Sequence, residues 1–536
     1  MKQRKILIIR IIVTVFITLL LYYFLLPPLN LTAPEFYLFL FLIFLVYSFT
    51  SVVKVIDIRN TIVNASTGSF KFIYYFLAVL LASVLILIIN LIFSPLFMSD
   101  AYAKRIIINK DSDFTTDVLE VDFNSIALLD KDSSRKLGDR VMGEMTELVS
   151  QFDVSDLYTQ INYNSDIVRV TPLDYADWIK YFTNRNNGVS GYIMVNSVTG
   201  DSNLVKLDEG MKYTPNALFF ENLYRYLRIK YPTEILGEES FEIDNEGNPY
   251  WIVPTIKYTA VGLMEEVSGV IIVNPINGDT KKYMVGEVPT WVDHVYPANL
   301  ILNQVDNWGK YQDGFWNSIF GQKGVVKPTD GYNYLAMNDD VYLYTGITSA
   351  VKDSSNLGFI LTNMRTKETS YYAVAGAEEY SAMASAEGQV QQMSYSATFP
   401  LLINLRGRPT YLISLKDNAG LVKMYAFVDV LDYQKVSVTE ASYGIEKAAS
   451  NYLNNLSFEN TTNELFRKNI VIKEINQAII DGITYYYLID NDLNKYRVSI
   501  KVNDEILGFI KVGDVINVSY MVDSEVKNVV EVNDEE

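Results

Sequence analysis

The chain contains 536 residues, of which 63 are acidic and 45 are basic, so its formal net charge is −18. Such an acidic surface repels nucleic acid, and the absence of cysteine excludes disulfides, thiol catalysis and zinc–thiolate sites. A single histidine excludes metal sites built from several histidines.

The first hundred residues contain three long apolar runs, at 6–26, 36–53 and 72–93. Each run has roughly 18–22 residues, which is enough to cross a hydrocarbon core of ~30 Å at 1.5 Å per residue. The sequence therefore predicts a three-helix transmembrane anchor over 1–98. A juxtamembrane segment with strands and a helix is expected to follow over 99–160.

The distribution of basic residues around these runs predicts the orientation of the anchor. They flank the first run and occupy the loop between the second and third, at Lys2, Arg4, Lys5, Lys54, Arg59 and Lys71. The loop over 27–35 contains none. By the positive-inside rule the N-terminus lies in the cytoplasm. We therefore expect a multi-pass protein of the cell membrane whose large C-terminal region is extracytoplasmic.

Two short patterns recur after the anchor. Residues 190–201 and 268–279 are identical at seven of twelve positions, and 357–368 is a fainter third copy. Each copy begins as an apolar strand and ends in a polar turn. A second pattern relates 241–249 to 401–409. Each of these two segments follows a predicted helix, at 216–231 and 378–392. Repeated α+β regions are therefore predicted over 161–290 and 346–437.

A helix followed by a hairpin whose second strand ends in an Asn-x-x-x-Gly-Asp turn resembles the PepSY module, a small extracytoplasmic α+β domain. In this chain that turn is present at 196–201 and 274–279. The resemblance covers about 165–285, with a degenerate copy over about 350–435. It implies that these regions bind or inhibit a partner protein and have no catalytic activity of their own.

An aromatic-rich connecting region is predicted over 291–345, between the two repeat regions. It contains three of the five tryptophans of the chain. Stacked aromatic rings beside polar side chains are typical of platforms that bind sugars or peptides, but the same residues also suit an irregular core. The candidate platform residues are Trp291, His294, Trp308, Tyr311 and Trp316.

The C-terminal part alternates between apolar and polar residues. A linker with a helix at 439–456 is expected over 438–464, and five short strands are expected over 465–536, at 470–475, 483–489, 496–502, 515–520 and 526–532. The pattern resembles small OB-like barrels. Because the region is acidic, the resemblance implies a spacer or docking role here, without oligonucleotide binding.

Sequence motifs of catalysis and metal binding are absent or incomplete. No Gly-x-Ser-x-Gly motif occurs. Ser-x-x-Lys occurs four times, at Ser51, Ser133, Ser349 and Ser524, without a later Lys-Thr-Gly. Residues 490–501 begin like a calcium loop, but they have Lys495 where glycine is needed and Lys501 where glutamate is needed. We therefore predict no catalytic, cofactor-binding or metal-binding residues.

The predicted fold class is a membrane-anchored α+β protein with three transmembrane helices, repeated helix-plus-hairpin modules and a small β-barrel. The predicted function is that of a membrane-tethered, non-enzymatic interaction or scaffolding protein of the bacterial cell envelope. Its partners would be the lipid bilayer and a protein or peptide. Two alternatives stay open: a carboxylate-dependent hydrolase acting on peptidoglycan or polysaccharide, and an accessory subunit of a membrane complex.

Overall fold

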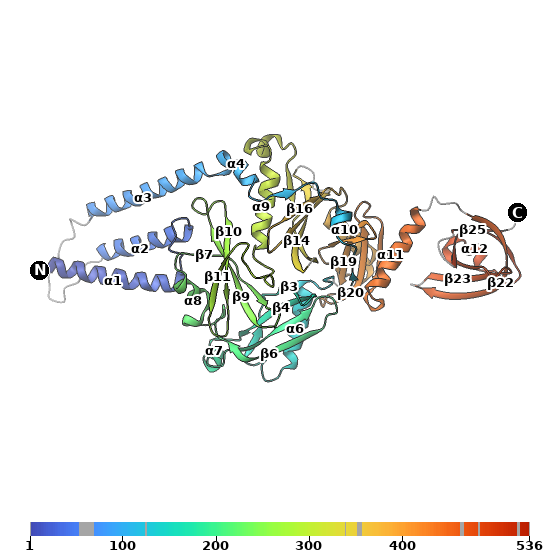
Figure 1. Ribbon diagram of the computed structural model, residues 1–536, viewed down its shortest axis with the longest axis horizontal. Coiled ribbons are helices and arrows are strands. Elements are labelled where there is room, and N and C mark those ends of the chain that lie inside the picture. Colours follow the sequence, from blue (N-terminus) through green and yellow to red (C-terminus); the bar gives the residue numbers. More distant parts are fainter. Residues whose placement is uncertain are drawn as a thin grey trace. The chain divides into compact units, whose positions relative to one another are not determined.

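The computed structural model describes residues 2–52, 69–123, 126–337, 339–350, 356–460, 466–480, 483–521 and 526–534. The chain forms two compact units, Met1–Tyr452 and Leu453–Glu536. The first unit contains the N-terminal helices and four β-sheets, and the second contains a β-barrel (Figure 1).

The N-terminal helices are α1 (Lys2–Leu25), α2 (Pro34–Val52), α3 (Ser69–Ile92) and α4 (Pro95–Ala103). The prediction of three transmembrane helices is wrong. Within the described residues, one helix is long and apolar enough to cross a membrane, at Leu7–Leu25. A second, Leu77–Ile92, qualifies only when joined to α4 across a bend of 49°. The remaining apolar helix, Pro34–Thr50, is shorter.

Two physical features explain this correction. Pro95 has no amide hydrogen and begins a new helix after the extended Ser94, so the third apolar run is interrupted. The second run begins inside the folded protein, because Ala33 is fully buried in a core that Phe36 also contacts. Some apolar side chains of this run, which the prediction places against lipid, therefore contact the protein core. Lys54 and Arg59, on which the predicted orientation partly rests, lie outside the described residues.

The predicted α+β fold class is also wrong, because beyond the N-terminal helices the regular structure of the first unit is mainly β-strands, arranged in four sheets. Each predicted hairpin is part of a sheet of five or six strands. A lone hairpin would leave unpaired backbone amides and carbonyls at both edges, and the additional strands form hydrogen bonds with these groups. In chain order, the strands are β1 (Ile108–Asn109), β2 (Phe152–Val154), β3 (Thr159–Tyr163), β4 (Asp166–Tyr175), β5 (Val189–Asn196), β6 (Ser202–Met211), β7 (Ile235–Leu236), β8 (Ser240–Ile243), β9 (Pro249–Lys257), β10 (Glu266–Val273), β11 (Thr280–Met284), β12 (Val326–Pro328), β13 (Asn333–Met337), β14 (Asp340–Ser349), β15 (Asn356–Asn363), β16 (Thr369–Tyr372), β17 (Ser396–Ala397), β18 (Leu401–Leu405), β19 (Arg408–Lys416), β20 (Val422–Asp429) and β21 (Val436–Glu440).

The four sheets share one strand order. In each, a long strand pairs on one side with two short preceding strands and on the other with the next strand, which in turn pairs with the last. The long strands are β4, β9, β14 and β19. The third sheet gains β1, which pairs with β16 in parallel. The likeness of these regions to PepSY modules stays a prediction.

Helices accompany the sheets: α5 (Phe114–Asp117), α6 (Lys131–Glu144), α7 (Trp178–Asn184), α8 (Leu223–Lys230), α9 (Ala298–Tyr311), α10 (Glu379–Gln389) and α11 (Ile445–Asn460). Shorter helical turns are η2 (Phe219–Glu221), η3 (Asn317–Gly321), η4 (Gln391–Met393) and η5 (Ala441–Tyr443). The helix expected at 216–231 is divided into η2 and α8, and the one expected at 378–392 into α10 and η4. The break in the first case lies at Asn222, whose backbone is extended and whose side chain caps α8 by accepting the Arg225 amide.

An Asx turn follows the same strand in every sheet. The side-chain oxygen of Asn196 accepts hydrogen bonds from two backbone amides, at 2.9 and 3.0 Å. Asn274, Asn363 and Asp429 do the same after β10, β15 and β20. Gly200 and Gly278 adopt the positive φ that closes the first two turns. The Asn-x-x-x-Gly-Asp pattern thus has a local structural cause.

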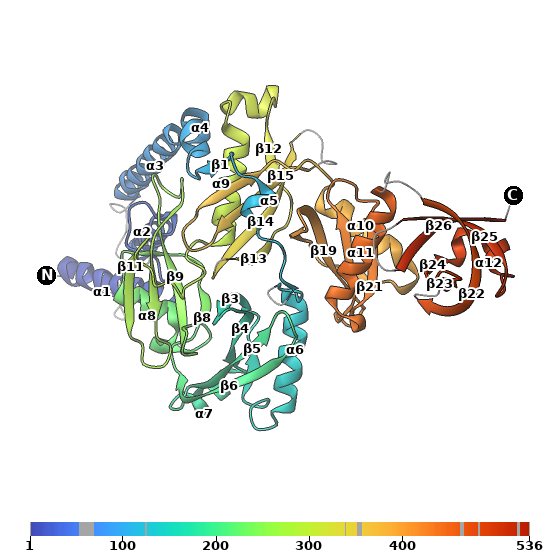
Figure 2. The ribbon, with the colours of Figure 1, turned by 45° about the vertical axis from the view of Figure 1, so that its right-hand side comes forward.

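The cores of the first unit lie between successive sheets (Figure 2). Trp251 and Val253 of β9 face the first sheet, whereas Ile252 and Ile256 face α9 and the third sheet. Because neighbouring side chains of a strand point to opposite faces, β9 contributes to two cores at once. Both faces of the second and third sheets are therefore buried, which explains the continuous apolar runs in their strands.

The second unit contains a closed barrel in the order β22-β23-β24-β26-β25. Its elements are β22 (Phe466–Ile480), β23 (Ile483–Asp490), β24 (Lys495–Ser499), η6 (Ile500–Val502), α12 (Asp504–Leu507), β25 (Val515–Met521) and β26 (Val526–Asp534). A small barrel is thus present, and its likeness to OB folds stays a prediction. Asp481 and Gly482, between β22 and β23, lie outside the described residues.

The segment that begins like a calcium loop is a barrel turn. Burial acts to raise the pKa of Asp490, but hydrogen bonds from Asn494, Lys468 and Tyr496 outweigh it and lower the pKa to about 2. The Asp490 carboxylate accepts the Asn494 amide at 2.8 Å and the Tyr496 hydroxyl at 3.0 Å. The carboxylate oxygens of Asp490 therefore accept hydrogen bonds that stabilise the turn. Within the described residues, no group of three or more acidic or histidine side chains could hold a metal ion.

Candidate functional site

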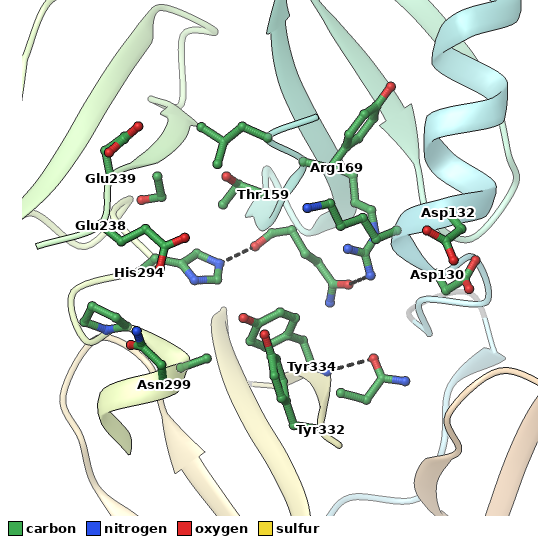
Figure 3. Close-up of a pocket in the computed structure, with 18 of the residues that line it drawn as sticks. Asp130, Asp132, Thr159, Arg169, Glu238, Glu239, His294, Asn299, Tyr332 and Tyr334 are labelled. Carbon is green, nitrogen blue, oxygen red and sulfur yellow. Dashed lines mark hydrogen bonds between the residues drawn. The ribbon is translucent and has the colours of Figure 1, made fainter. Parts of the chain in front are cut away.

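The candidate site is a cavity of about 440 Å³ where the first three sheets approach one another. Its walls come from the start of α6, from β3 and β4, from the loop before β8, from the start of α9 and from β13 (Figure 3). In the close-up, Glu238 and Glu239 lie opposite Asp130 and Asp132, and Tyr332 and Tyr334 close the side between them. The volume suits a small molecule or a short peptide segment.

Arg169 is a buried cation at the base of this cavity. It lies in the middle of β4 and is 5% exposed. Its Nη2 donates to the Gln160 side-chain oxygen at 2.8 Å. Its Nε has no hydrogen-bond partner in the described part of the chain, and no described carboxylate forms an ion pair with the guanidinium. Burial lowers the pKa of Arg169, whereas the electrostatic effects of Tyr334 and Asp130 act to raise it. The cation is thus largely uncompensated.

Gln160 and His294 extend this polar base. Gln160 is buried, and its Nε2 has no partner among the described residues. His294 Nε2 lies 2.6 Å from the Gln160 backbone oxygen. A carbonyl oxygen can only accept, so the proton of the ring is on Nε2. The ring also stands edge-on to Tyr334, with centroids 5.5 Å apart. Among the residues that line the cavity, Arg169 Nε and Gln160 Nε2 are therefore buried donors without a partner in the described part of the chain, as is the hydroxyl of Tyr158.

The rim of the cavity is acidic. Asp130 caps α6 by accepting the Ser133 amide at 2.9 Å, and it pairs with Lys416 at 2.5 Å. Burial raises the pKa of Glu239, which accepts a hydrogen bond from the Tyr224 hydroxyl. Glu238 and Asp132 add two further carboxylates. Lys131 also lines the rim, so acidic side chains outnumber basic ones there, above a base that holds the Arg169 cation. This pattern suits a ligand with both charges.

A buried carboxylate pair lies behind His294. The Glu242 carboxylate accepts the backbone amides of Asp293 and His294, at 2.8 and 3.1 Å. Asp293 accepts the Asn162 amide at 2.7 Å. Burial, reinforced by the Glu242 carboxylate, raises the pKa of Asp293 well above its ordinary value. This pair connects the segment before α9 to β3 and β8, and so holds His294 in place.

Replacing Asp293 by Asn is expected to stabilise the protein at neutral pH and to change its stability little below about pH 4. The raised pKa means that the folded state favours the protonated acid. The stability that Asp293 contributes is complete below the pKa that its carboxyl has in the unfolded chain. It is lost as the pH rises through the higher pKa of the same carboxyl in the folded state. Asn resembles the protonated acid at every pH. Thermal unfolding in detergent at pH 4 and pH 7.5 measures the difference, and equal effects at both pH values would contradict this account.

The structure does not bring the five predicted platform residues together. His294 lines the cavity, whereas Trp291 packs on Tyr250 with centroids 5.1 Å apart. Trp308 belongs to α9 and is buried in the core between the second and third sheets. Tyr311 stacks on Phe315, and Trp316, 62% exposed, makes an edge-to-face contact with Phe315.

Sequence reasoning missed Gln160, Arg169, Tyr332 and Tyr334. One signal was available, since Arg169 interrupts a strand that is otherwise mostly apolar, from Ile167 to Leu173. A charged residue in such a strand is costly unless it has a partner or a ligand.

Comparison with known proteins provides no family for this chain. No family model and no curated protein matches it. A solved structure of Trypanosoma rangeli sialidase in complex with a difluorinated keto-deoxy-nononic acid is 9% identical, with a TM-score of 0.15. The match covers 71% of this chain and 53% of that chain, so it spans about half of the sialidase. It supports neither a fold nor a function here.

Proposed function

We propose that the chain is a membrane-tethered interaction protein of the bacterial cell envelope that binds a peptide or protein partner in the cavity at Arg169. The ligand group at the base is a carboxylate. The observation that carries this proposal is the buried, uncompensated guanidinium beside a second unused donor, Gln160 Nε2.

The energetics favour an anionic ligand group. An isolated buried charge costs several kcal/mol even after relaxation, and pairing with an opposite charge recovers much of that cost. A planar carboxylate matches the fork of a guanidinium, and hydrogen bonds between charged groups are the stronger kind. The acidic rim at Glu238 and Asp132 suits a basic group on the same ligand. A peptide that carries both charges satisfies both ends of the cavity.

The anchor in this proposal is α1. It is the helix near the N-terminus that could cross a membrane. The basic residues Lys2, Arg4 and Lys5 favour a cytoplasmic N-terminus, and a single crossing then places the sheets outside. Tethering holds the cavity near membrane-bound partners at a high effective concentration.

The orientation can be tested with single cysteines, because the chain has none of its own. We expect Asp208→Cys, exposed on β6, to react with a membrane-impermeant maleimide on intact cells. Lys2→Cys is expected to react only after the cells are lysed. Labelling of Lys2→Cys alone on intact cells would contradict the extracytoplasmic assignment.

Photocrosslinking tests the binding site. A benzoylphenylalanine at Tyr332, in the cavity, is expected to crosslink short peptides with a free carboxyl terminus in membranes. The same residue at Tyr443, which is exposed and outside the cavity, serves as the control. Peptides ending in an amide should crosslink at least tenfold less, and acidic side chains in amidated peptides show whether a side-chain carboxylate suffices. Equal crosslinking of acids and amides, or equal yields at both positions, would contradict carboxylate recognition in this cavity.

A further inference from the structure

A second surface of the first unit has no role in the cavity. Exposed aromatic and aliphatic side chains gather on α7, η2 and the end of α1: Trp178, Ile179, Phe182, Phe219, Phe220 and Phe24. We call them the aromatic patch. Trp178 is 65% exposed and Phe24 is 71% exposed. A contiguous apolar surface of this kind is rare on soluble proteins and marks an interaction site.

The aromatic patch is continuous with the helix that could span a membrane. The Trp178 ring packs against Phe182, and Phe182 against Phe219, with centroids 6.4 and 6.1 Å apart. The next residue, Phe220, packs against Tyr23 at 6.1 Å. Tyr23 lies in the last turn of α1, and Figure 1 shows the end of α1 next to α8. The patch therefore begins where α1 would leave the hydrocarbon core.

Hydrogen bonds hold α8 against the end of α1. Arg225 lies over the Tyr23 ring at 4.2 Å and donates its Nε to the Tyr23 carbonyl at 3.3 Å. Arg228 donates its Nε to the Leu26 carbonyl at 2.9 Å. These contacts satisfy carbonyls at the end of α1 that have no partner within the helix. They fix α8 and η2 beside the exit point of the helix.

Basic residues accompany the aromatic patch in an otherwise acidic chain. Lys180, Arg225 and Lys230 belong to α7 and α8, and within the described residues none of them forms an ion pair. The nearby Glu221 is already paired with Arg185 at 3.1 Å. Aromatic rings with cationic neighbours are typical of surfaces that lie in the headgroup region of a bilayer.

We propose that the aromatic patch inserts into the interface of the bilayer that α1 crosses, where Lys180, Arg225 and Lys230 contact anionic phospholipid headgroups. The continuity with α1 and the local positive charge favour lipid over a protein partner. Insertion would hold the first two sheets against the membrane surface. The proposal rests on α1 as a span and is independent of the ligand of the cavity.

Depth-dependent quenching tests this proposal with the full chain in vesicles of phosphatidylcholine and phosphatidylglycerol. Ile179→Cys carries a fluorophore in the aromatic patch, and Asp208→Cys, exposed on β6 outside the patch, carries the matched control. Nitroxide lipids labelled near the headgroup are expected to quench the label at 179 at least fivefold more than the label at 208. Equal quenching at both positions, with the chain still resistant to carbonate extraction, overturns the proposal. Loss of the chain on carbonate extraction also overturns it, because α1 is then not a span.

Charge reversal tests the lipid headgroup. Lys180→Glu combined with Lys230→Glu should lower the quenching at 179 in vesicles with phosphatidylglycerol to the level in pure phosphatidylcholine. No change on charge reversal overturns the role of anionic lipid. Quenching that varies with the ratio of protein to lipid indicates that a second copy of the chain covers the patch, which also overturns the proposal.

Discussion

Replacing Arg169 by Met should abolish the crosslinking of carboxylate peptides while leaving the folding stability within about 1 kcal/mol of the original. The substitution removes a buried cation that has no carboxylate partner among the described residues, which is favourable. It also leaves the Gln160 side-chain oxygen without its donor, at a cost of about 1–3 kcal/mol. The two effects have opposite signs and largely offset each other.

Arg365→Met is the matched control for this prediction. Arg365 pairs with Asp340 through two hydrogen bonds of 2.8 Å, and Asp340 is buried. Removing the arginine leaves a buried carboxylate without its cation, so a loss of about 3 kcal/mol or more is expected. Chemical unfolding in detergent measures both variants. Similar losses of stability in the two would show that Arg169 is a structural residue and would argue against a ligand site.

Replacing Trp251 by Ala should destabilise the protein by about 3–5 kcal/mol. Trp251 lies on β9, is almost completely buried, and packs against Phe241 with centroids 5.1 Å apart. Its Nε1 donates to the Tyr213 carbonyl at 2.9 Å, so the substitution leaves both a cavity and an unsatisfied acceptor. Because this core joins the first and second sheets, the walls of the candidate site should separate and peptide crosslinking at Tyr332 should fall as well.

Trp316→Ala makes the same chemical change on the surface. Trp316 is largely exposed and contacts Phe315 and Phe320. We expect its loss to change the free energy of unfolding by no more than about 0.5 kcal/mol. Thermal unfolding of both variants, followed by near-ultraviolet circular dichroism, makes the comparison. A Trp316 variant as unstable as the Trp251 variant would contradict the described packing.

Several features of this fold could be predicted because their causes are local. The barrel strand predicted at 483–489 corresponds to β23, since alternation of apolar and polar residues directly reflects the two faces of a strand. The strand predicted at 470–475 is much longer in β22, because it pairs with both β23 and β25. Strand length thus depends on neighbours that a single segment does not reveal.

The anchor shows the opposite case. Hydropathy detects apolar side chains but does not distinguish lipid from a protein core as their surroundings. The run at 36–53 met the length criterion, yet its start packs in the core that contains Ala33 and Ile252. The bend after Ile92 depends on Pro95. A hydropathy window reports only the mean over many residues, so it does not reveal the effect of one proline.

The sequence by itself determined the features whose interactions span a few residues. These are the apolar α1, the alternation of the barrel strands and the Asn-x-x-x-Gly-Asp turns, where one side chain bonds amides two and three residues ahead. The tertiary structure alone decided the candidate site. Gln160 and His294 are 134 positions apart, and they meet because the sheets share cores that bury both faces of each middle sheet. That packing also left Arg169 buried without an anionic partner among the described residues, and this is the feature on which the proposed function rests.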